Sequence, residues 1–158
     1  MSSLKSFLFL CAVLLLTSFS TYSQITVYTI QNFNFGTFYQ GSSGGTINVS
    51  TTGTRTATGD IILMNTWNSA AQAILEIQAP AGSVISITNG ADAVLTGSNG
   101  GTVSLHLESS NLGSPFTTTA VPPARTTLNI AGKLTIGNSA TSPPGTYQGT
   151  FSITFNQE

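Results

Sequence analysis

One histidine and a few carboxylates are the residues of this chain that could carry acid–base chemistry. His106 is the only histidine and stands between Leu105 and Leu107, so strand geometry would turn it away from both leucines. A serine hydrolase needs a serine and a carboxylate beside such a histidine, and the G-x-S-x-G motif that presents the serine in one large class is absent. We therefore interpret His106 as a polar residue on the outer face of a strand.

The carboxylates do not form a recognisable pair either. A glycosidase would draw two of them from Asp60, Glu76, Asp92 and Glu108. Glu76 and Glu108 each alternate with apolar residues, which is typical of charges that face solvent from a strand. The sequence therefore predicts a protein that is not an enzyme and has no catalytic residue.

Metal ligands are equally sparse. Asn89, Asp92 and Asn99 lie close together but match no calcium-binding loop, and asparagine and aspartate are common in turns. The only cysteine, Cys11, lies in an apolar N-terminal segment, so the remaining chain has no thiolate to combine with His106 in a zinc site. We predict neither a metal nor a cofactor.

The N-terminal residues have the pattern of a secretory signal peptide. Lys5 supplies the positive charge, residues 7–16 (FLFLCAVLLL) are apolar, and the polar residues 17–23 (TSFSTYS) precede the expected cleavage after Ser23. The apolar run is shorter than the roughly 20 residues of a membrane span. Since the mature chain from Gln24 onward would lack disulfides, we expect a bacterial protein, secreted or held in the cell envelope.

Few charges remain once this leader is set aside. Three basic residues, Arg55, Arg125 and Lys133, are widely separated in the sequence, and acidic residues outnumber them. Nucleic acids and anionic membranes both require clustered cations, so the composition excludes these two classes of partner. Serine, threonine and asparagine replace the charges, which is typical of extracellular β-domains and of subunits that assemble.

The apolar residues recur at every second position rather than with a helical period. The clearest run is 146–156 (TYQGTFSITFN), and 127–137 places four aliphatic residues on one face around Gly132, which we expect to mark a bulge or a close crossing. Further strands are expected within 46–50, 59–64, 73–78, 84–88 and 103–108.

Turn-forming residues separate these runs, as in Gly41–Gly45 (GSSGG), Gly97–Gly101 (GSNGG) and Ser142–Gly145 (SPPG). The spacing predicts one all-β domain over residues 24–158, an antiparallel β-sandwich of immunoglobulin-like or pilin-like type with seven to nine short strands. A small β-barrel is the alternative.

Trp67, in the polar segment NTWNS, is the only tryptophan. Its ring could stack on a sugar or anchor a protein partner, and it could equally fold back on the edge of the core. Both interpretations stay open at this point.

Five segments carry a resemblance to a known class of domain. They are Phe35–Phe38 (FGTF), Gly44–Ser50 (GGTINVS), Thr54–Gly59 (TRTATG), Ala131–Gly137 (AGKLTIG) and Pro144–Thr154 (PGTYQGTFSIT). In these segments the chain resembles a family of secreted bacterial domains of unknown function, similar in layout to fimbrial pilin subunits and spore-coat-type pilin domains.

The resemblance implies an incomplete sandwich that a neighbouring subunit completes by donating a strand. It makes Gln24–Ile30 the candidate donor, with Ile25, Val27 and Ile30 as its plugs. The groove would be flanked by the C-terminal strand, with side chains Tyr147, Phe151, Ile153 and Phe155. The alternative is that Gln24–Ile30 pairs within its own domain as a first strand.

We therefore expect a structural or adhesive component of the cell surface that assembles with itself or with other surface subunits. The alternative is a monomeric secreted module that binds a glycan or a protein ligand through loop aromatics such as Trp67.

Overall fold

A computed structural model of the chain describes residues 24–65 and 69–158. The fold is all-β and antiparallel, as the alternating sequence predicts, and its strands form a large curled sheet and a small second sheet. The large sheet contains β1 (Thr26–Gln31), β2 (Phe38–Val49), β3 (Arg55–Leu63), β4 (Ala73–Gln78), β6 (Ala93–Gly97), β7 (Thr102–Ser110), β9 (Thr126–Ile136) and β10 (Tyr147–Gln148). The small sheet contains β5 (Val84–Asn89), β8 (Phe116–Thr117) and β11 (Ile153–Gln157). None of these residues lies in a helix that could cross a membrane.

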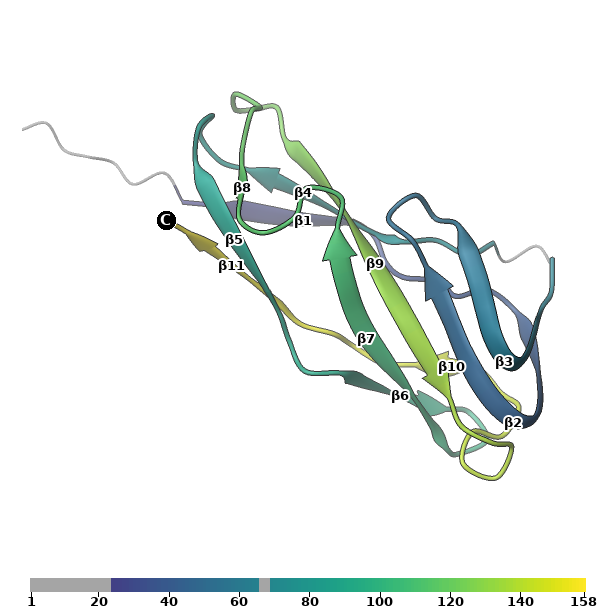
Figure 1. Ribbon diagram of the computed structural model, residues 1–158. Coiled ribbons are helices and arrows are strands. Elements are labelled where there is room, and N and C mark those ends of the chain that lie inside the picture. Colours follow the sequence, from purple (N-terminus) through teal and green to yellow (C-terminus); the bar gives the residue numbers. More distant parts are fainter. Residues whose placement is uncertain (1–23, 66–68) are drawn as a thin grey trace, which may run out of the picture.

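The large sheet forks at β9. One edge of β9 pairs with β7 along most of its length. The other edge pairs with β4 over residues 126–130 and with β2 over residues 132–136. The β2–β3 hairpin therefore diverges from the β1–β4 pair, as Figure 1 shows.

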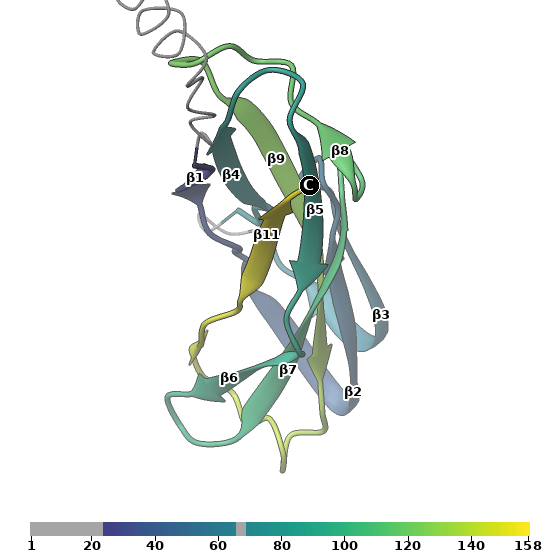
Figure 2. The ribbon, with the colours of Figure 1, turned by 90° about the vertical axis from the view of Figure 1, so that its left-hand side faces the viewer.

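The small sheet covers one half of the large sheet and leaves the other half to β6 and β10. Figure 2 shows β5 and β11 in front of β4 and β9. Their inner faces enclose one cluster of buried side chains, which includes Leu75, Ile85 and Leu128. A second cluster includes Ile47, Leu105 and Leu134 and receives residues of β6 and β10 at its margin. This two-layer arrangement confirms the predicted β-sandwich, although the described residues form eleven strands and not the seven to nine that the sequence predicted.

The C-terminal run predicted as one strand is divided in the structure. β10 pairs with β6 of the large sheet, whereas β11 pairs with β5 of the small sheet. Gly149 lies at the crossing, where a Cβ atom would come within 2.8 Å of the carbonyl oxygen of Val94. The chain changes sheets here, so the ladder is interrupted although the alternation of side chains continues.

The turn predicted at Gly41–Gly45 is wrong. These residues lie inside β2, where the pairing with β3 steps from Gln40↔Ile61 to Gly45↔Gly59 and leaves a bulge. Strand pairing continues on both sides, so the glycines bend a long strand instead of ending it. The turn predicted at Gly97–Gly101 is confirmed, since it joins β6 to β7.

Candidate functional site

An open apolar groove runs along one side of the sandwich. It lies between an N-terminal lip, residues 25–40, and a C-terminal lip, residues 143–155. Its wide part has a volume of about 850 Å³ and its narrow part about 520 Å³. Thr29, Leu75 and Phe151 line both parts, so the two are continuous.

The floor and walls of the groove carry no charge. The floor of the wide part consists of aliphatic side chains from the large sheet: Leu75, Leu95, Leu105, Leu134 and Ile136. Neither part is lined by an aspartate, glutamate, lysine, arginine or histidine. An occupant of this groove would therefore gain its affinity from apolar contact and from backbone hydrogen bonds.

The C-terminal lip presents the side chains that the alternation predicts. Tyr147, Phe151, Ile153 and Phe155 all line the groove and are half-buried, whereas Gln148, Ser152 and Asn156 are exposed. Burial raises the pKa of Tyr147, whose hydroxyl donates a hydrogen bond to the carbonyl oxygen of Pro143. The C-terminal lip is thus a row of large apolar side chains that are only partly buried.

The two lips do not join into one sheet. β1 pairs only with β4, and β11 pairs only with β5, among the strands of the described residues. β1 begins and β11 ends at the same end of the molecule, so the two strands run in opposite directions along the groove (Figures 1 and 2). Each therefore turns a strand edge without ladder partners toward the gap.

The outer face of β1 is fastened to its own sheet. The guanidinium of Arg125 lies 3.7 Å from the centre of the Tyr28 ring and forms an ion pair of 3.0 Å with Glu76. The Tyr28 hydroxyl lies 3.4 Å from the side-chain oxygen of Gln78. In this structure the segment Gln24–Ile30 is thus the first strand of its own domain, which is one of the two alternatives the sequence left open.

The three candidate plug residues of that segment differ in position. Ile25 and Val27 line the narrow part of the groove, and Val27 is 37% exposed. Ile30 is 53% exposed and lies at a bulge, because Thr29 pairs with Leu75 while Gln31 pairs with Ile74. The bulge separates Ile30 from the face shared by the other two.

Two aromatic residues, Phe33 and Phe35, line the wide part of the groove, and Phe33 was not among the residues that the sequence singled out. Phe33, in the linker between β1 and β2, makes an edge-to-face contact with Phe151 at 5.4 Å and stacks on Phe35 at 5.7 Å. Arg55 holds this linker by donating hydrogen bonds to the carbonyl oxygens of Phe35 and Thr37. The alternation of Phe33 and Phe35 was the available signal, but it lies in a linker and not in a strand.

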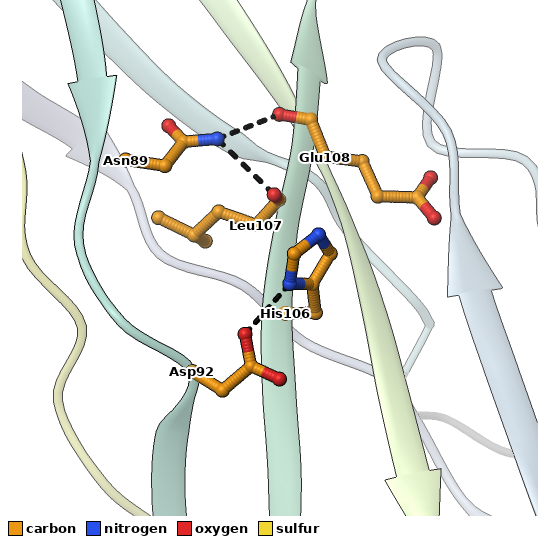
Figure 3. A network of polar contacts seen from close by, with 5 residues as sticks. All are labelled: Asn89, Asp92, His106, Leu107 and Glu108. Atoms are coloured by element: carbon orange, nitrogen blue, oxygen red, sulfur yellow. Dashed lines mark hydrogen bonds and ion pairs between the residues drawn. The ribbon is translucent and has the colours of Figure 1, made fainter.

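His106 lies on the outer face of β7, opposite to the face of the groove-lining Leu105, and Figure 3 shows its surroundings. Its Nδ1 atom is 2.6 Å from a carboxylate oxygen of Asp92, and both side chains are about half exposed. In the part of the chain that the structure describes, no hydroxyl group forms a hydrogen bond with this ring.

The other polar candidates are dispersed. Asn89 donates hydrogen bonds to the carbonyl oxygens of Leu107 and Glu108, and Asn99 donates one to Pro144 (Figure 3 shows the first two). Within the described residues, no group of three or more histidine, cysteine and acidic side chains is placed to hold a metal. Asn89 and Asn99 thus donate to carbonyl oxygens in different parts of the chain.

Two predicted features lie outside the described residues. Trp67 falls in the segment 66–68, and the predicted signal peptide is residues 1–23. Both stay predictions of the sequence.

Residues 25–156 match the protein family described as domain of unknown function DUF4402. The chain belongs to this family. The match spans the sandwich from Ile25 to Asn156 and so includes both lips of the groove. Searches of curated proteins and of solved structures found no significant match.

Proposed function

We propose that this DUF4402 protein is an exported, non-enzymatic structural or adhesive subunit of the bacterial cell surface. In this proposal its groove receives an extended segment of a neighbouring subunit. The observation that carries the proposal is the continuous, uncharged groove between two strand edges that pair with nothing across the gap.

An added strand would supply the hydrogen-bond partners that both strand edges lack and would also cover the partly buried apolar side chains. An extended peptide offers backbone N–H and C=O groups to the edges of β1 and β11, and its alternate side chains cover the half-buried residues of the lips. Each Å² of apolar surface removed from water contributes about 25 cal/mol. Several large side chains are only partly covered here, so an added strand would gain substantially from covering them.

The strand comes from another subunit in this proposal. Residues 24–30 could act as a donor only by leaving β4, with which β1 shares its ladder and its contacts through Tyr28 and Arg125. We therefore keep this segment in its own sheet and treat exchange of β1 between copies as the competing route.

A charge placed in the groove tests the proposal. The protein would be extracted from its own cell surface under mild denaturant, and its mass measured by size exclusion with light scattering. We expect the wild type in complexes and the Ile153→Lys variant as a folded monomer, because a lysine on the inner face would oppose an apolar strand. Asn156→Lys, on the exposed face of the same strand, is the matched control and should behave as wild type.

A wild type that is monomeric at the cell surface, with a thermal midpoint equal to that of Ile153→Lys, would contradict the proposal. It would then favour the monomeric secreted binding module as the function.

A further inference from the structure

We infer that Phe33 divides the groove and selects the strand that can enter it. The inference rests on the proposed function and assigns to its binding site a residue that determines specificity. It follows from the place of one aromatic ring relative to the floor and to both lips.

The Phe33 ring reaches the floor of the groove because β9 has a glycine beneath it. A Cβ atom on Gly132 would lie 2.8 Å from Cε1 and 2.9 Å from Cζ of Phe33, so any larger residue would displace the ring. The sequence predicted a close crossing at this glycine, and the approaching group is a side chain and not a backbone. Gly132 thus seats Phe33 below the level of the neighbouring side chains of β9.

Contacts on both sides hold the ring in this seat. Phe33 packs against both clusters of buried residues, and it contacts Phe35 of its own lip and Phe151 of the opposite lip. A ring with neighbours below and on two sides is more costly to expel than a side chain that only lines a wall. We therefore expect an incoming strand to pass over Phe33 and not to replace it.

The occupant is an uncharged, extended peptide segment of another surface subunit. The uncharged lining excludes an ionic ligand, and the bare edges of β1 and β11 call for backbone hydrogen bonds that an acyl chain could not make. From Tyr147 to Phe155 the C-terminal lip spans about nine residues, or roughly 30 Å of extended chain.

Such a strand would need one pattern of side chains. Phe33 lines the wide part and contacts Phe151, which lines both parts, so large apolar residues would enter the wide part before this pair of rings and the narrow part beyond it. The inward residue between them would face the Phe33 ring and would have to be small, ideally glycine. The geometry thus selects for a strand with a small residue at the centre of an otherwise large and apolar alternation.

Two synthetic peptides test this selection. Each would have about nine residues that alternate isoleucine and threonine, with lysines at both ends for solubility. The central inward position would be glycine in one peptide and phenylalanine in the other. Binding to the chain without its predicted leader would be followed by fluorescence anisotropy, with thermal melts to confirm that each variant is folded.

We expect the wild type to bind the glycine peptide at least about tenfold more tightly than the phenylalanine peptide, because overpacking is costly. In Phe33→Ala the ratio should fall to about one, through a gain in binding of the phenylalanine peptide. Phe38→Ala is the control, since it removes an aromatic ring from the wide part and leaves Phe33 in place. That variant should weaken binding of both peptides and keep the ratio.

Each negative result would overturn a different part of the proposal. Equal binding of the two peptides to wild type, or a ratio unchanged in Phe33→Ala, would overturn the role of Phe33 and leave the groove as a strand site. Absence of binding by either peptide to both proteins would overturn the proposed function itself. Polymers formed by the chain alone would identify a second copy as the donor and overturn the assignment to another subunit.

Discussion

The centre of the sandwich and its groove are built from the same alternating pattern, yet they differ in how completely their apolar side chains are buried. Leu128, Ile130 and Leu134 of β9 have at most 3% of their surface exposed, because β9 has neighbours on both edges and a layer above it. The inward residues of β11 are only half-buried and Val27 of β1 is 37% exposed, and each of these strands has one neighbour. Alternation therefore decides which face is apolar, whereas neighbouring strands decide whether that face is sealed.

The largest test of this difference replaces a leucine in each region. Leu128→Ala should destabilise the protein by about 2–5 kcal/mol, because this side chain is fully buried between the two sheets. Leu95→Ala, in the half-buried floor of the groove, should cost roughly half as much. Urea unfolding of both variants would measure the difference, and equal losses would mean that the groove is closed in solution.

The second test concerns the seat of Phe33. Gly132→Ala should cost about 1–3 kcal/mol, because its methyl group would push the ring off the floor. The same substitution made in a Phe33→Ala background should cost much less, since the obstructing ring is gone. A double-mutant cycle in urea measures this coupling, and additive losses would show that the strain lies elsewhere.

A smaller effect is expected on the fastening of the N-terminal lip. Arg125→Ala removes both the contact with Tyr28 and the ion pair with Glu76. The side chains of Arg125 and Glu76 are each about one-third exposed. The loss should be about 1 kcal/mol. Hydrogen exchange should quicken in β1 and stay unchanged in β7, and unchanged exchange in β1 would mean that its ladder alone holds the strand.

The smallest effect concerns the hydroxyl of Tyr147 on the C-terminal lip. Burial raises its pKa in the folded protein, so the unfolded chain loses this proton first as the pH passes about 10. Folding stability should therefore fall above that pH in the wild type, and less steeply in Tyr147→Phe. Thermal melts between pH 8 and 11, compared with a Tyr39→Phe control, would measure the difference. Identical slopes in wild type and Tyr147→Phe would contradict this cause.

Much of the fold followed from the sequence, because alternation and turns are local signals. The inward faces of β9 and of the C-terminal lip were predicted correctly. The division of the C-terminal run into β10 and β11 was not, because it depends on the approach of Gly149 to Val94, far away in the sequence.

The groove was only partly predictable. The row from Tyr147 to Phe155 has a period of two and could be read directly. Phe33 alternates with Phe35, but its role also depends on a glycine about a hundred positions away, which no local pattern indicates. Whether Gln24–Ile30 remains in its own sheet also depends on the contact of Arg125 with Tyr28, which no local sequence pattern indicates.

The crossing of the C-terminal residues from one sheet to the other also determines when the groove can form during synthesis. During synthesis these residues follow β6 and β5, the strands with which they pair, by about fifty positions or more. Until they arrive, the edges of β5 and β6 are bare and only one lip exists. A nascent chain that lacks these residues therefore has no groove.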